Sequence, residues 1–323
     1  MRTSKAPLWL VLLALLACPL PVVAQNYPEK SIRLVVGYQT GVAYLLALLI
    51  ADKLRELLGQ PVVPDFRTGA AGNIAVEAAA KAPPDGYTLL LTSVGFVISP
   101  SLFPKLGYNT FRDFAPISLL AATPNVMVVH PSVPAQSLAE LVKLAKAHPG
   151  KLNFGSGGIG SGAHLGSELF KTLNKINIVH VPYKGAAIAM TAMLSGEVDM
   201  VTSSVAATIP LVNSGKIRAL AVMATERVAT LPKVPTAAEA GMPELVVITW
   251  WGLLAPAGTK PDIIERLNAE VVKLMNAPET KSKLVQVEVD ASTSTPVEFA
   301  KLVRAEYEKW GRVIKDASIR VQE

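Results

Sequence analysis

Residues 151–173 read KLNFGSGGIGSGAHLGSELFKTL, and this stretch decides the fold. A short run with apolar side chains, residues 151–154, leads into a loop rich in glycine and serine, and residues 165–173 follow with apolar residues at helical spacing. The stretch therefore predicts a strand, a glycine-rich loop and a helix in succession. This is the repeating unit of an open α/β sheet, whose ligands bind at the carboxyl ends of the strands and the helix N-termini.

The same unit recurs on both sides of this stretch, in two series. The first series predicts strands at 32–37, 61–63 and 86–92, separated by helices at 43–58 and 70–82. The second predicts strands at 125–130, 152–154, 178–181, 198–202 and 217–223, with helices after Ser137, after the glycine-rich loop, at 186–194 and up to Ser214. Two successive open, parallel-type sheets predict an α/β protein of two lobes with a ligand cleft between them.

The end of the chain returns to the first lobe. Residues 248–254 predict a strand, residues 261–276 an amphipathic helix, and the capping box at residues 295–298 a last helix that ends near Lys315. We therefore expect the first lobe at 25–125, the second lobe at 126–247 and the return segment at 248–323.

Residues 1–24 have the pattern of a secretory signal peptide. Arg2 and Lys5 precede an apolar run at 8–17, and small residues end at Ala24, before the expected cleavage. Residues 15–18 resemble a bacterial lipobox, so lipid attachment at Cys18 is the alternative to cleavage after Ala24. We expect an exported protein without a further membrane span.

Composition excludes several classes of function. The chain has 323 residues and a net charge of +6; without Arg2 and Lys5, 29 basic residues face 25 acidic ones. This mild excess suits a small anionic ligand and does not indicate nucleic acid. The four histidines are scattered, so we expect no metal site and no cofactor.

The glycine-rich loop admits more than one chemistry. Residues 155–160 fit G-x-G-x-x-G, but the acidic residue that a dinucleotide site needs about twenty positions later is absent, because Glu197 is the next acid after Glu168. What remains is an anion site made by backbone amides, by the hydroxyls of Ser156 and Ser161 and by the positive end of a helix. The alternative is a tight turn with a serine cap. No nucleophile elbow surrounds these serines, and His164 suits capping or packing better than general base catalysis.

Eight segments together resemble one known family, the substrate-binding proteins of tripartite tricarboxylate transporters, also called Bug receptors. They are SIRLVVGY, GYTLLLTS, DFAPISLLAATPNVMVVHPSVPAQSLAELVKLAKAHPGKLNFGSGGIGSGAHLGSELF, VHVPYKGAA, SGEVDM, KIRALAV, LPKVPTAAEAGMP and WWGLLAPAGT. The resemblance implies a periplasmic, monomeric receptor of the type II binding-protein fold, not an enzyme. Such a receptor closes its lobes on a small carboxylate and delivers it to inner-membrane permease subunits.

The resemblance also implies which residues bind the ligand. One loop follows the first strand and supplies Tyr38, Thr40, Gly41 and Tyr44; the other supplies Ser156, Ile159, Gly160 and Ser161, with the amides of the last three on a carboxylate. Three serines stand at strand ends that face the cleft, and a tryptophan forms a wall: these are Ser93, Ser203, Ser204 and Trp251, with Trp250 as the alternative wall.

The first loop departs from the family pattern. The family has a sequence close to G-G-G-x-D where this chain has Thr40-Gly41-Val42-Ala43-Tyr44. The loss of two glycines and an acid suggests a less polar pocket, hence an apolar or aromatic mono- or dicarboxylate with Tyr38, Tyr44 or Phe96 against its body. Tyr44 can equally pack its own helix. A sensor receptor for a signalling kinase and an organic-acid enzyme on the same fold are the alternative functions.

Overall fold

The structure is a computed structural model that describes residues 27–39, 41–103, 105–287 and 289–320. The expected signal peptide, Cys18 and Thr40 lie outside the described residues. No helix in the described ranges is long and apolar enough to cross a membrane.

The first lobe is built on three parallel strands in the order β2-β1-β3. They are β1 (Ile32–Val36), β2 (Val62–Phe66) and β3 (Thr88–Ser93). Every residue of β3 is buried, as expected for a parallel strand covered on both faces. The helices of this lobe are α2 (Gly41–Leu58), the short 3-10 turn η1 (Ala70–Gly72), α3 (Asn73–Ala80) and α4 (Gly95–Leu102).

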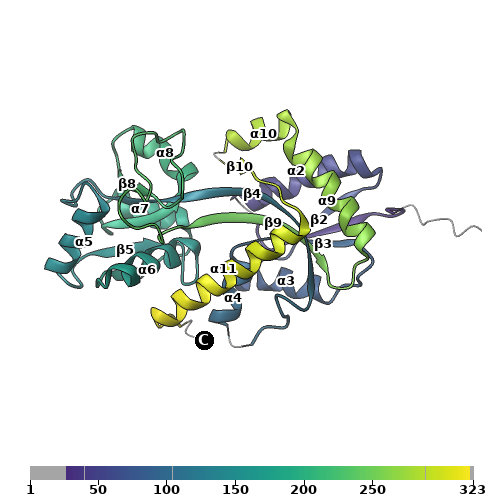
Figure 1. Cartoon of the computed structure of the whole chain (residues 1–323), viewed down its shortest axis with the longest axis horizontal. Helices are drawn as coiled ribbons and strands as arrows, with labels where there is room; N and C mark the ends of the chain where they lie inside the picture. The colour runs from purple at the N-terminus through teal and green to yellow at the C-terminus, as the bar shows by residue number, and fades with distance from the viewer. Residues whose placement is uncertain (1–26, 40, 104, 288, 321–323) are drawn as a thin grey trace, which may run out of the picture.

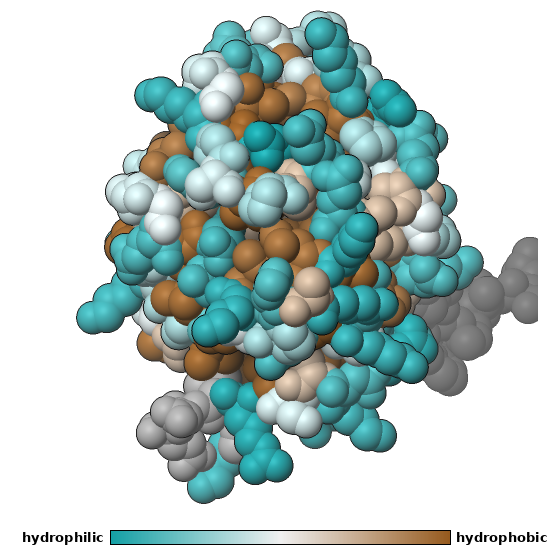
Figure 2. Space-filling model, turned by 90° about the vertical axis from the view of Figure 1, so that its left-hand side faces the viewer, coloured by the Kyte–Doolittle hydropathy of each residue, from teal (hydrophilic) through white to brown (hydrophobic). Residues whose placement is uncertain are grey.

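The second lobe repeats the pattern with the parallel order β7-β5-β6. Its strands are β5 (Asn153–Ser156), β6 (Val179–Pro182), β7 (Met200–Ser204) and β8 (Arg218–Val222). Its helices are α5 (Leu138–Ala147), α6 (Gly162–Asn174), α7 (Ala186–Leu194) and α8 (Val205–Asn213). Figure 2 views the end of the molecule formed by this lobe, where hydrophobic side chains lie among hydrophilic ones.

Two long strands join the lobes into one mixed sheet (Figure 1). They are β4 (Phe114–Val129) and β9 (Ile248–Pro256), which pair antiparallel to each other. β4 pairs with β9 up to Pro124 and with β7 from Asn125 onward. The two sheets expected from the sequence are therefore parts of a single sheet, and we propose the lobe boundary at this exchange of partners.

The C-terminal helices complete the first lobe and reach the second. α9 (Pro261–Asn276) and α10 (Pro278–Val285) precede the short strand β10 (Asp290–Ala291), and α11 (Pro296–Asp316) follows. The predicted capping box is confirmed, with Thr295 and Glu298 each bonded to the other's backbone amide. α11 contacts α4 in the first lobe and α6 in the second, so it runs along both lobes (Figure 1).

Candidate functional site

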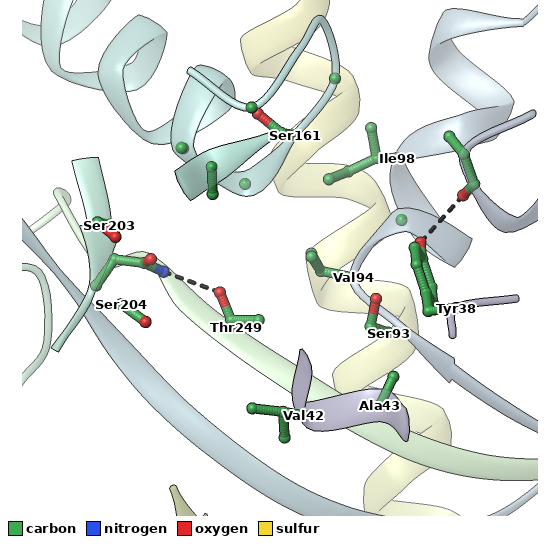
Figure 3. A pocket seen from close by; sticks show the side chains of 18 of the residues that line it. Tyr38, Val42, Ala43, Ser93, Val94, Ile98, Ser161, Ser203, Ser204 and Thr249 are labelled. Atoms are coloured by element: carbon green, nitrogen blue, oxygen red, sulfur yellow. Dashed lines mark hydrogen bonds between the residues drawn. The ribbon is translucent and has the colours of Figure 1, made fainter. Parts of the chain in front are cut away.

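A cavity of about 520 Å³ lies between the lobes and is lined from both sides. The first lobe contributes the starts of α2 and α4 and the end of β3; the second contributes the glycine-rich loop, the start of α6 and the end of β7 (Figure 3). The carboxyl ends of β3, β5 and β7 thus meet at one place, as the open-sheet pattern predicts.

Eight of the residues singled out in the sequence line this cavity: Tyr38, Ser93, Ile159, Gly160, Ser161, Ser203, Ser204 and Trp251. Three other residues of the two expected binding loops lie elsewhere. Gly41 begins α2 outside the lining, and the Tyr44 ring packs on Phe66 with 5.3 Å between ring centroids. Ser156 is fully buried beneath the glycine-rich loop.

The aromatic residues divide between the cavity and the core. The Tyr38 hydroxyl donates to the carbonyl of Ala71 at 3.0 Å, and burial raises the pKa of this phenol. Phe96 packs in the core against Phe114, with 5.2 Å between ring centroids, and does not line the cavity. Trp250 is also a core residue, so Trp251 is the tryptophan at the cavity wall.

Five helices direct their N-terminal ends at the cavity. The lining includes first-turn or cap residues of α2, α4, α6, α7 and α8: Val42 and Ala43, Val94 and Gly95, Ser161 to Ala163, Ala186, and Ser204 to Ala207 without Val205. Helix N-termini carry partial positive charge and unpaired amide donors. None of the described residues that line the cavity has a charged side chain. The described site is therefore electropositive through its backbone alone.

The glycine-rich loop uses several of its amides internally. The Gly160 amide donates to His164 Nδ1 at 3.1 Å, and the Ser161 amide donates to the Gly158 carbonyl at 3.2 Å. Of the three amides expected to hold a carboxylate, only that of Ile159 remains without an acceptor in the described part of the chain. The amides of Gly162 and Ala163, in the first turn of α6, are also without one and belong to residues that line the cavity.

The serine hydroxyls have defined tasks. Ser161 Oγ accepts from the amide of His164 at 3.2 Å and so caps α6, and Ser204 Oγ accepts from the amide of Ala207 at 3.3 Å and caps α8. Both caps place a hydroxyl at the cavity rim while leaving its hydrogen free to donate to a bound oxygen atom (Figure 3).

The sequence analysis missed α4, which forms an apolar wall. Ile98, Leu102 and the following Phe103 line the first-lobe side of the cavity. The signal was obscured by Pro100, which is inside this helix. Two polar residues at the crossing of β4 and β9 were missed as well: Asn125 Nδ2 donates to Thr249 Oγ1 at 3.1 Å, and both residues line the cavity (Figure 3).

Comparisons with known proteins agree with this architecture. Residues 46–319 match the profile of the tripartite tricarboxylate transporter family receptor. The chain belongs to this receptor family. It is 38% identical over 290 residues to a protein encoded in the tcbD-tcbE intergenic region of Pseudomonas sp. (strain P51), covering 89% of this chain and 86% of that one. It is 33% identical over 305 residues to BugT of Bordetella pertussis, covering 94% of each chain.

A solved structure provides a ligand-bound comparison. The structure of R. palustris Rpa4515 with adipate has a TM-score of 0.79 and 35% identity to this chain, covering 91% of this chain and all of its own. The expected membership in the Bug receptor family and the two-lobed binding-protein fold are thus confirmed.

Proposed function

We propose that this chain is a periplasmic, non-enzymatic receptor that closes its lobes on a small carboxylate with an apolar body and delivers it to the permease subunits of a tripartite transporter. The observation that carries this proposal is the convergence of five helix N-termini on a cavity whose described lining has no charged side chain. Such a site suits an anion of low charge, because amide donors and helix dipoles can hold one carboxylate without a cation.

The carboxylate is proposed to bind at the second lobe. The amides of Ile159, Gly162 and Ala163 and the hydroxyl of Ser161 surround that end of the cavity. Ser203 and Ser204 add hydroxyls at the end of β7, where Ser203 is buried. Hydrogen bonds from neutral donors to a charged acceptor are stronger than those between neutral groups, so a few of them suffice.

The body of the ligand is proposed to lie against the first lobe. Val42 and Ala43 from α2, with Ile98 and Leu102 from α4 and Phe103 directly after it, present apolar surface there. The adipate in the structure of R. palustris Rpa4515 has a body of this kind, with four methylene groups between its carboxylates. Burial of each methylene group is favourable by about 0.8 kcal/mol, so this wall favours acids with apolar bodies over hydroxylated ones.

A ligand panel tests the proposed class of ligand. Thermal unfolding of the purified protein would be followed with adipate, hexanoate, benzoate, malate and citrate, with NAD as a control. A ligand at about 100 times its Kd adds about 2.7 kcal/mol to the free energy of unfolding, which shifts the midpoint by degrees. We expect adipate, hexanoate or benzoate to stabilise the protein more than malate and citrate. Stabilisation by citrate or malate alone would contradict the apolar wall, and stabilisation by none of the acids would contradict the receptor function.

A matched pair of variants tests the proposed carboxylate-binding site at the start of α6. Gly162 is the first residue of α6, a position where proline is tolerated, and Ser161 before it has φ −66° and ψ 154°, which suits a residue preceding proline. Gly162→Pro removes one amide donor, whereas Gly162→Ala keeps it and its methyl group meets nothing closer than 3.8 Å. A hydrogen bond to a charged group contributes about 1.5–3 kcal/mol, so we expect Gly162→Pro to weaken binding by about 10- to 150-fold relative to Gly162→Ala. Equal affinities in Gly162→Pro and Gly162→Ala would show that the Gly162 amide does not contribute to carboxylate binding.

A further inference from the structure

A cluster of rings lies beneath the glycine-rich loop, with Phe154 and His164 buried and His180 half-buried, and the proposed ligand does not use it. The imidazoles of His164, from α6, and His180, from β6, stack with 4.0 Å between ring centroids. Phe154, from β5, stacks against His180 with 4.7 Å between ring centroids, and its centroid lies 6.2 Å from that of His164. His164 is only 3% exposed and lines no part of the cavity. This cluster therefore needs an explanation other than contact with the ligand.

Each imidazole is tied to a glycine amide of the loop. His164 Nδ1 accepts the Gly160 amide at 3.1 Å. Ser156 Oγ accepts the Gly158 amide at 3.2 Å and lies 2.6 Å from His180 Nε2. The loop is thus attached to the ring cluster at two alternate residues, on either side of Ile159.

These hydrogen bonds constrain Gly158 and Gly160, two glycines of the loop whose backbone has positive φ. Gly158 has φ +120° and Gly160 has φ +80°, conformations that glycine reaches easily and also leaves easily. A chain of glycines and serines loses much conformational entropy when it adopts one shape. Specific hydrogen bonds to the residues beneath the loop offset that loss, and they leave the amides of Ile159, Gly162 and Ala163 without an acceptor among the described residues.

The protonation of the histidines suits this task. Burial, with further contributions from His180 and Lys171, lowers the pKa of His164 to about 3. Burial and Lys171 lower the pKa of His180 to about 4. Both rings are therefore neutral near pH 7, and a neutral His164 that accepts at Nδ1 carries its proton on Nε2, which lies 3.9 Å from Glu168 Oε1.

We propose that His164 is a positioning residue: by accepting the Gly160 amide at Nδ1 it holds the glycine-rich loop in the conformation that binds the carboxylate, and His180 does the same for Gly158 through Ser156. This inference rests on the proposed receptor function and identifies the residues that order the carboxylate-binding loop before a ligand binds. Ordering the loop in advance improves affinity, because the bound state then costs less conformational entropy.

Two variants of His164 separate the hydrogen bond from the packing. His164→Asn places Oδ1 near the position of Nδ1 and so keeps an acceptor, whereas His164→Phe keeps a stacking ring and removes the acceptor. Hydrogen–deuterium exchange of the ligand-free full chain would report on residues 157–162. We expect strong protection of the Gly160 amide in the wild type and in His164→Asn, and at least about tenfold faster exchange in His164→Phe. Equal exchange in all three proteins would overturn the proposal.

Adipate binding, measured by calorimetry, gives the second readout. We expect the Kd to rise by about tenfold or more in His164→Phe and to be rescued in His164→Asn. If His164→Asn were as impaired as His164→Phe, the acceptor would not be the relevant feature and the proposal would fail. If the wild type bound no acid at all, the receptor function would be refuted, while the exchange data would still decide whether His164 orders the loop.

A measurement on the wild type covers the case in which His164→Phe does not fold. In uniformly ¹⁵N-labelled protein, a hydrogen bond from the Gly160 amide to Nδ1 gives a scalar coupling between the two nitrogens, and Nδ1 has the chemical shift of an unprotonated ring nitrogen. Observation of both supports the proposal. A protonated Nδ1 without the coupling would overturn it.

Discussion

Gly160→Ala is the substitution that most directly tests whether the lobes approach each other as this structure has them. Gly160 belongs to the second lobe, but a methyl group on it would lie 2.3 Å from Leu102 Cδ1 of the first lobe, and 3.9 Å from Ile98 Cγ2. An ordinary contact needs at least 3.4 Å, so the two lobes would have to separate, or Leu102 to move, by about 1 Å. Leu102 is buried against the core, which limits its movement.

The free-energy cost of Gly160→Ala has two parts: one affects unfolding, and the other affects closure of the lobes. The backbone of Gly160 has φ +80°, and an alanine in this region costs about 1–2 kcal/mol, which lowers the free energy of unfolding whether or not the lobes are together. The overlap with Leu102 exists only when the lobes are close, and overpacking of this kind costs about 1–3 kcal/mol. Binding requires the closed lobes, so we expect the affinity for carboxylate to fall by about 5- to 150-fold.

The control is Gly215→Ala, which has the same backbone strain without the overlap. Gly215 has φ +71°, and a methyl group there would meet no atom within 4 Å. Urea unfolding should show a similar loss of stability in both variants, and calorimetric titration with the acid that stabilises the wild type most should show a loss of affinity in Gly160→Ala alone. Unchanged affinity in Gly160→Ala would mean that the bound lobes do not meet at Leu102, and the reasoning would be refuted.

Three further predictions concern stability. The pKa values of His164 and His180 in the folded protein lie below the usual 6.5, so the unfolded chain binds more protons than the folded chain between about pH 4 and 6.5. The free energy of unfolding, measured with urea at several pH values, should therefore fall as the pH falls through that window. The fall should be less steep in His164→Asn. Gly252→Ala would place a methyl group 2.0 Å from Cζ of the fully buried Phe299, and we expect a loss of at least about 2 kcal/mol in denaturant, where a loss under 0.5 kcal/mol would contradict the packing. Thr295→Ala removes the cap of α11 and should cost about 1 kcal/mol in the same assay, with Thr295→Ser close to the wild type.

Local signals predicted much of the fold. The helices α7 and α9 begin and end where glycine, proline and apolar spacing place them, the Ser137 cap marks the start of α5, and the capping box at 295–298 marks the start of α11. These features depend on residues within one turn of each other, which is the range over which sequence patterns act.

The length of β4 could not be predicted in the same way. The sequence pattern predicted only the end of this strand, at 125–130, whereas the strand begins at Phe114 and contains both Pro116 and Pro124. Pro116 stands beside an irregularity in the pairing with β9, where proline is tolerated, and Pro124 stands where β4 exchanges β9 for β7. Such tolerance depends on the neighbouring strands, which the local sequence does not contain.

The candidate site also contains residues that the sequence could place and residues that it could not. Ser93, Ser203 and Ser204 could be placed because strand ends of an open sheet meet at the cleft. The apolar wall of α4 and the internal use of the Gly160 amide by His164 could not, because both depend on side chains that meet only after the chain has folded.

The uncharged lining has a consequence for the energetics of capture. Tyr38 is the one titratable side chain among the described residues of the cavity wall, and burial raises its pKa, so it stays neutral near pH 7. A carboxylate that enters already ionised then exchanges no proton with this wall. The heat of binding should be the same in phosphate and in Tris, whose ionisation enthalpies differ widely, and the affinity should stay level for as long as the acid itself remains ionised.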